Sequence, residues 1–182
     1  MGAYSVTGTG NGAVERSQPR IQNIVKGSNI APNAVSPSKL DLMPIIVSTA
    51  TYTLDHADAG KVIVIDRAAG SVITLPASVG NGDLFKFVVA TTVTSNNITI
   101  KVANTTDSFI GNALMCKDGG SSVDGFESSG TSNADSFVLN GSTTGGYAGD
   151  MVQIIDIKSG KFFANYVGAG TSTEATPYAA SV

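Results

Sequence analysis

Short segments in which apolar and polar residues alternate fill the chain from Ser48 onward, and this period of two is the strongest constraint on its fold. Residues 49–54 alternate threonine with alanine, tyrosine and leucine, and residues 84–90 and 97–102 follow the same rule. Such alternation is typical of strands that bury one face and expose the other. The run Val62–Ile65 is instead apolar at every position, which predicts a strand buried on both faces.

Turn-forming residues separate these segments at short intervals. A Gly-Asn-Gly sequence lies at residues 80–82, and Pro76 ends the strand expected at residues 72–75. Residues 151–157 and 162–167 are predicted to form a closing hairpin around a tight turn. The whole pattern predicts about nine short strands and no helix. We therefore expect an all-β fold, an antiparallel β-sandwich of jelly-roll type.

Residues 1–47 differ from the rest because glycines and prolines interrupt apolar pieces that have neither helical nor strand periodicity. This pattern predicts an extended N-terminal arm that needs another surface to cover it, although a disordered leader is the alternative. Residues 48–168 are expected to form the β-sandwich domain, and residues 169–182 a flexible C-terminal tail. The residues through which we expect the arm to bind are all apolar: Ile21, Ile24, Val25, Ile30, Val35 and Leu40.

The chain carries little charge, which excludes some classes of partner. Charged residues make up 14% of the sequence, against about 25% in an average protein. The net charge is −3, and Lys and Arg form no cluster that would neutralise a row of phosphates, so we expect no nucleic acid as partner. The longest mostly apolar runs, residues 43–47 and 84–90, fall far short of the roughly 20 residues that span a bilayer, so we expect no membrane either.

Titratable residues are too few and too scattered to suggest catalysis. The only histidine, His56, lies between Asp55 and Asp58 in a predicted turn, where neighbouring side chains point apart, so we interpret it as a surface residue. The only cysteine, Cys116, is expected to be a buried structural thiol. The acidic residues that follow it lack the spacing of a calcium-binding EF-hand loop. We predict a protein that is not an enzyme and that holds no metal or cofactor.

Two aromatic residues fall in segments that composition marks as loops. Phe126 lies in the Gly-, Ser- and Asp-rich stretch 117–135, and Tyr147 lies in the turn-rich link before the closing hairpin. An exposed aromatic ring can stack on a sugar, so both residues are candidates for contact with a receptor or carbohydrate. Packing against the body of the protein is the alternative for each of them.

Residues 58–104 carry a characteristic order of features. A strand closes on a Gly-Lys turn, an Asp ends the next strand, and a further strand runs into Thr74-Leu75-Pro76. The Gly-Asn-Gly turn then precedes an aromatic strand and an I-T-I-K-V hairpin. This order resembles virion proteins of tailed bacteriophages, namely capsid decoration (cement) proteins, head fibres and tail fibre modules. The ending GDMVQIIDIKSGKFFANYV is similar to the closing hairpin of such modules, although the family often has Trp where this chain has Phe162.

The resemblance implies a homotrimer on the outer surface of the virion capsid, with the major capsid protein as its partner and the N-terminal arm on the shell. Our leading hypothesis is a non-enzymatic decoration protein that binds the outside of the phage head and stabilises it. The alternative is a head or tail fibre module that binds a host-surface receptor or carbohydrate through Phe126 and Tyr147.

Overall fold

The computed structural model describes residues 42–117, 120–128, 130 and 134–181, all within the compact unit Asp41–Val182. The predicted binding residues of the arm, from Ile21 to Leu40, lie outside the described residues. The described part of the chain folds into two β-sheets that share one hydrophobic core, with one short 3₁₀ helix, η3 (His56–Asp58). The predicted all-β sandwich is therefore confirmed.

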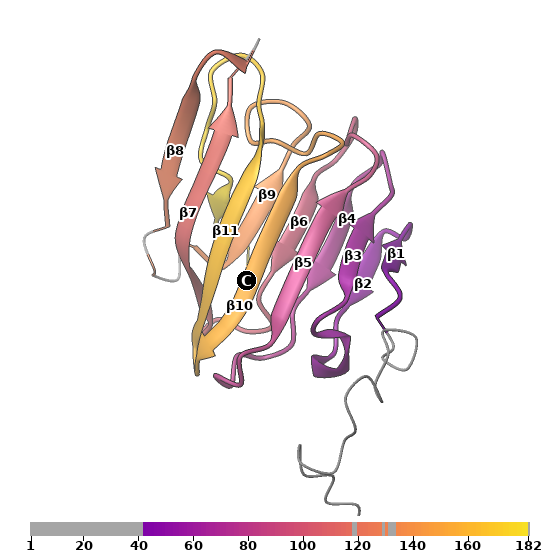
Figure 1. Ribbon diagram of the computed structural model, residues 1–182, viewed down its shortest axis with the longest axis vertical. Helices are drawn as coiled ribbons and strands as arrows, with labels where there is room; N and C mark the ends of the chain where they lie inside the picture. The colour runs from indigo at the N-terminus through magenta and orange to yellow at the C-terminus, as the bar shows by residue number, and fades with distance from the viewer. Residues whose placement is uncertain (1–41, 118–119, 129, 131–133, 182) are drawn as a thin grey trace, which may run out of the picture. The chain divides into compact units, whose positions relative to one another are not determined.

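The larger sheet has seven strands, shown in front in Figure 1. In spatial order they are β1 (Ile45–Val47), β3 (Val62–Ile65), β5 (Leu84–Val89), β10 (Met151–Lys158), β11 (Lys161–Ala169), β7 (Ser108–Cys116) and β8 (Val123–Glu127). The smaller sheet has five strands, in the order β12 (Tyr178–Ala179), β9 (Ser136–Leu139), β6 (Ile98–Lys101), β4 (Ser71–Thr74) and β2 (Thr51–Thr53).

The two sheets are mixed rather than antiparallel throughout, which corrects the expected strand directions. The first six strands pass alternately between the sheets, so that β1, β3 and β5 are parallel neighbours in one sheet and β2, β4 and β6 in the other. Strands β7 and β11 are also parallel, while the predicted hairpin β10–β11 is antiparallel. Alternation along a strand reports which face is buried but not the direction of its neighbour. These pairings do not establish a jelly roll.

The core lies between the sheets and is filled by the inward positions of the alternating strands. Phe85, Phe87, Ile98 and Ile100 are at most 1% exposed. An aromatic cluster fills the part of the core between β7, β9 and β11, with ring centroids 4.6 to 6.4 Å apart. Its members are Phe109, Phe137, Phe162, Tyr166 and Tyr178.

Both ends of the β body differ from the boundaries expected from the sequence. Strand β1, which was predicted as the end of the arm, pairs with β3 and buries Val47 completely. At the other end, the predicted tail contains β12, which pairs with β9 and leaves Tyr178 only 8% exposed. A single buried aromatic side chain is enough to fix such a short strand, and two residues are too few to show alternation.

Candidate functional site

Phe126 lies on a strand and not in a loop, which corrects its predicted role as an exposed platform. It belongs to β8 and pairs with the buried Ala113 of β7. Partners in an antiparallel pair point to the same face of a sheet, and Phe126 accordingly packs, partly buried, against the core. The glycine and the two acidic residues of this strand disguise it as a loop, because such residues are depleted in strands.

The other residues around Phe126 form a shallow hollow on the outer surface of the larger sheet. Its volume is about 260 Å³, and Asn112, Leu114, Glu127 and Asn165 line it together with Gly125 and Phe126. Two amides and a carboxylate give it both donors and acceptors of hydrogen bonds. The Oδ1 atom of Asn165 is buried and has no hydrogen-bond partner in the described structure. A buried acceptor without a donor is costly to the folded state.

Tyr147 is half-buried, and both its backbone and its side-chain hydroxyl make hydrogen bonds. Its backbone N–H donates to Asp150 Oδ2 at 3.0 Å, and its hydroxyl lies 3.0 Å from Thr171 Oγ1. With Cys116 and Gly170 it lines a separate hollow of about 300 Å³. The ring is therefore held in place at the edge of this hollow.

A buried carboxylate, Asp150, holds the segment around Tyr147 against β11. It accepts hydrogen bonds from the backbone N–H groups of Gly146 and Ala169, at 2.7 and 3.0 Å, and from the hydroxyl of Tyr166 at 2.7 Å. Burial, together with the adjacent Asp150 carboxylate, raises the pKa of Tyr166 above its usual range, so this tyrosine stays protonated and remains a donor. The Asp150 carboxylate thus joins the link before the closing hairpin to β11.

Cys116 is exposed, which contradicts the predicted buried thiol. It lies at the end of β7, where the side chains of Ala113 and Met115 point inward and those of Leu114 and Cys116 point outward. The last four residues of this strand, 113–116, are all apolar or sulfur-containing, so alternation could not assign the cysteine to one face.

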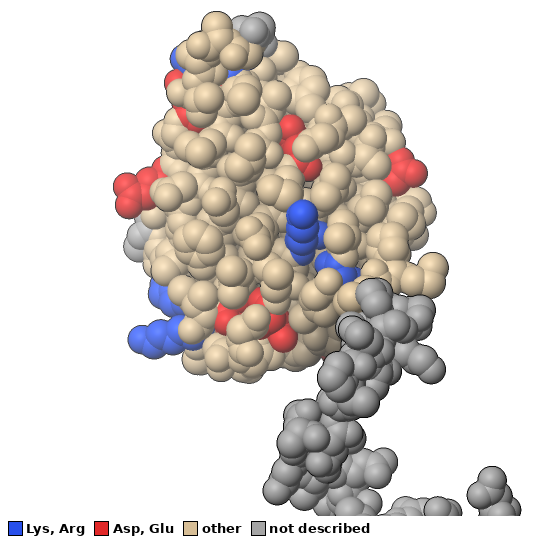
Figure 2. Space-filling model, in the orientation of Figure 1, with Lys and Arg blue, Asp and Glu red and all other residues tan. Residues whose placement is uncertain are grey.

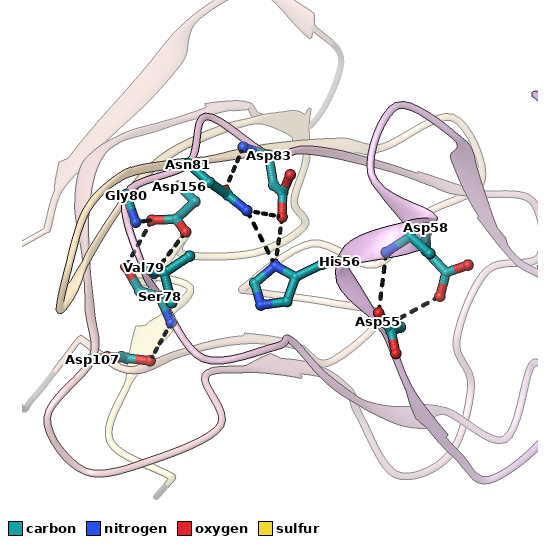
Figure 3. A network of polar contacts seen from close by, with 11 residues as sticks. Asp55, His56, Asp58, Ser78, Val79, Gly80, Asn81, Asp83, Asp107 and Asp156 are labelled. Carbon is teal, nitrogen blue, oxygen red and sulfur yellow. Dashed lines mark hydrogen bonds and ion pairs between the residues drawn. The ribbon is translucent and has the colours of Figure 1, made fainter. Parts of the chain in front are cut away.

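His56 is within hydrogen-bond distance of a residue far away in the sequence (Figure 3). Its Nδ1 lies 2.6 Å from Asp83 Oδ2, and the side-chain amide of Asn81 donates to the same oxygen at 2.8 Å. Neither of its sequence neighbours provides this carboxylate, because Asp55 caps η3 and Asp58 completes a capping box with it. These contacts assemble an acid–histidine pair rather than a triad, and the histidine side chain is 42% exposed.

The serine closest in sequence to this pair is already engaged elsewhere. The hydroxyl of Ser78 donates to Asp156 Oδ1 at 2.8 Å and lies 2.7 Å from the carbonyl oxygen of Lys158. The same carboxylate accepts the backbone N–H groups of Val79 and Gly80 at 2.8 and 2.9 Å (Figure 3). Burial opposes ionisation of Asp156, but these hydrogen bonds bring its pKa below the usual value. The arrangement holds the loop 78–83 against β10.

Metal ligands do not gather in the described residues. No group of three His, Cys, Asp or Glu side chains lies close enough there to hold an ion. A separate search of the same residues finds no helix with the length and apolar character needed to cross a membrane.

Sequence reasoning missed the outer surface of the larger sheet as a candidate site. The apolar run of β3 was interpreted as a strand buried on both faces. In the structure Val62 and Val64 point outward and are partly exposed, so this run could instead have indicated an apolar outer surface. Comparison of the chain with protein-family models, with curated proteins and with solved structures finds no match.

Proposed function

We propose that this protein is a non-enzymatic decoration protein, which binds the outer surface of a tailed-bacteriophage capsid and stabilises the shell. The observation that carries the proposal is the resemblance of residues 58–104 to virion β-modules. These residues contain β3, β4, β5 and β6, four strands that pass alternately between the two sheets. The proposed partner is the major capsid protein, and the proposed assembly is a homotrimer.

The physical basis of the proposal is binding through apolar contacts, with no catalysed reaction. The proposed contacts with the shell are made by the apolar residues of the N-terminal arm, with Ile24 and Ile30 among them. Covering apolar side chains contributes roughly 25 cal/mol per Å², from which the ordering of an extended segment must be subtracted. A homotrimer presents three arms, and repeated attachment raises the overall affinity without any new kind of contact.

A fibre module that binds a carbohydrate is the second candidate. The hollow lined by Asn112, Glu127 and Asn165 supports it, because amide and carboxylate groups pair well with sugar hydroxyls. Phe126 does not supply a stacking platform there, since its side chain packs against the core. Tyr147 is the remaining aromatic contact for this alternative.

Binding of the full-length chain to empty phage capsids tests the proposal. The bound fraction is measured by co-sedimentation, and the shell is heated with and without the protein to measure its melting temperature. We expect tight binding and a higher melting temperature of the shell. In the double variant Ile24→Asp/Ile30→Asp the affinity for the capsid should fall at least tenfold, and the increase in melting temperature should be lost. The matched control is Val72→Asp, the same kind of change at an exposed valine of β4.

A chain that binds no capsid, or whose binding is unaffected by the double variant, contradicts the proposed role of the arm. Binding to a glycan array that is lost in Asn112→Ala supports the fibre alternative instead. The two functions are therefore distinguished by the same set of purified proteins.

A further inference from the structure

The outward side chains of the larger sheet lie in rows that cross its strands. The register pairs Ile46 with Val64, Val64 with Val88, Val88 with Met151, Met151 with Val167 and Val167 with Leu114. A second row, four residues away along the strands, joins the side chains of Leu84, Ile155, Phe163 and Ile110. Both rows are apolar along their whole length.

A polar row lies between the two apolar rows. Starting from β5, the register pairs Lys86 with Gln153, Gln153 with Asn165, Asn165 with Asn112 and Asn112 with Glu127. Its two ends carry opposite charges, and its middle consists of three amides. Within the described residues of the three rows, Lys86 and Glu127 are the only charged side chains. We call the surface formed by these three rows the row face.

The row face is not a typical water-facing surface. A sheet with one wet face carries polar residues at most of its outward positions, whereas here Ile46, Leu114 and Val167 are 56, 46 and 45% exposed. Figure 2 shows this side of the molecule and few charged residues on it. The three rows cross six, five and four strands. With strands about 4.8 Å apart and rows about 6.8 Å apart, they cover roughly 500 Å². This is smaller than the approximately 800 Å² per partner of a standard interface, but exposed apolar patches of several hundred Å² mark interaction sites.

We propose that the row face is the surface through which copies of this chain pack together, around an axis parallel to its strands. Rotation about such an axis does not change the position of a row along the strand direction. Each apolar row therefore faces the same apolar row of the other copy. The rotation also turns the Lys86 end of the polar row toward the Glu127 end of the next copy. The charges at the two ends are therefore complementary in this arrangement.

The amides in the middle of the polar row support the same arrangement. When a second polar row faces the first, the side-chain amides of Asn112 and Gln153, which reach the surface, meet amides of the second copy that both donate and accept hydrogen bonds. Sheets that pack face to face keep their strand directions within about 30° of each other, which the parallel axis satisfies. The inference rests on one part of the proposed function, the assembly of several copies of this chain. It does not depend on binding to the capsid.

Charge-reversal substitutions at the two ends of the polar row test the inference. The mass of the full-length chain is measured by sedimentation velocity over a range of concentrations. We expect the wild type to form a closed oligomer. Lys86→Glu and Glu127→Lys each place like charges opposite one another and should raise the dissociation constant at least tenfold. The double variant Lys86→Glu/Glu127→Lys should return it to within about threefold of wild type, because opposite charges face each other again.

The control is Lys101→Glu, which makes the same change on β6 of the smaller sheet and should leave the mass unchanged. Thermal unfolding of each variant verifies that it is folded, and Lys86 and Glu127 are exposed. A wild-type chain that stays monomeric overturns the inference, because something other than a second copy then covers the row face. A double variant no better than the single ones overturns it as well. Loss of capsid binding with an intact oligomer instead rejects the proposed function alone.

Discussion

Replacing Asp156 by Asn should destabilise the β body substantially while changing only one atom. Asp156 is 1% exposed, and its carboxylate accepts hydrogen bonds from Ser78, Val79 and Gly80. The Asn side chain keeps one acceptor oxygen, but its NH₂ group must face either the N–H of Val79 or the donors from Ser78 and Gly80. A lost hydrogen bond to a charged group costs about 1.5 to 3 kcal/mol, and a buried donor left unpaired adds to this cost.

We therefore expect Asp156→Asn to lower the free energy of unfolding by about 3 kcal/mol. For a domain of about 150 residues, each kcal/mol lowers the melting temperature by about 2 to 4 °C, which gives a decrease of about 9 °C at pH 7. Circular dichroism during heating measures it. The control is Asp124→Asn, since Asp124 pairs with Lys117 at 3.0 Å on the surface, and exposed ion pairs contribute about 0 to 1 kcal/mol.

The difference in melting temperature between wild type and Asp156→Asn should also depend on pH. The hydrogen bonds hold the pKa of Asp156 below its usual value, so the folded state favours the ionised carboxylate. The resulting stability is fully present above the unfolded pKa of about 3.9 and is lost as the pH falls through the lower folded pKa. The difference in melting temperature should therefore narrow between pH 5 and about pH 2. A difference below about 2 °C at pH 7, or one that stays constant down to pH 2, refutes this reasoning.

Four further substitutions test other parts of the β body by urea unfolding. Tyr178→Ala should cost about 3 kcal/mol because it empties a buried aromatic position, and a change below about 1 kcal/mol would mean that the C-terminal segment does not pack as described. Gly141→Ala should cost more than about 2 kcal/mol, because φ is 76° and the new Cβ would lie 2.0 Å from the carbonyl oxygen of Val93; Gly82→Ala, with φ of 84° but open space, should cost about 1 kcal/mol. His56→Ala should change stability by less than about 1 kcal/mol, since its contact with Asp83 is exposed, and a loss above about 2 kcal/mol would contradict this.

The period of two predicted the strands of the body because burial on one face repeats at every second residue. It assigned β5 and β6 with their inward residues, and it gave the closing hairpin β10–β11. The direction of pairing could not be predicted in this way. Strands that pass alternately between two sheets become parallel to the strand two places earlier, and nothing within a single strand records that path.

Contacts between distant segments limited the prediction of the candidate site. The carboxylate that binds His56 comes from Asp83, 27 residues away, whereas the neighbouring Asp55 and Asp58 are used for capping. Phe126 was placed in a loop because its strand is rich in residues with low strand propensity, and its pairing with β7 overrides that propensity. Contacts between segments far apart in the sequence therefore determine both the partner of His56 and the strand conformation of Phe126.

The polar row is the clearest example of a feature that no single strand contains. In β10 the amide Gln153 lies between the outward Met151 and Ile155, and in β11 Asn165 lies between Phe163 and Val167. Within these two triplets, each strand has a single ordinary polar residue on its outward side. A slip of two residues between β10 and β11 would put Asn165 opposite Met151 or Ile155 and interrupt the row. The row therefore exists because of the register, and the same register places opposite charges at its two ends, where a rotated copy can meet them.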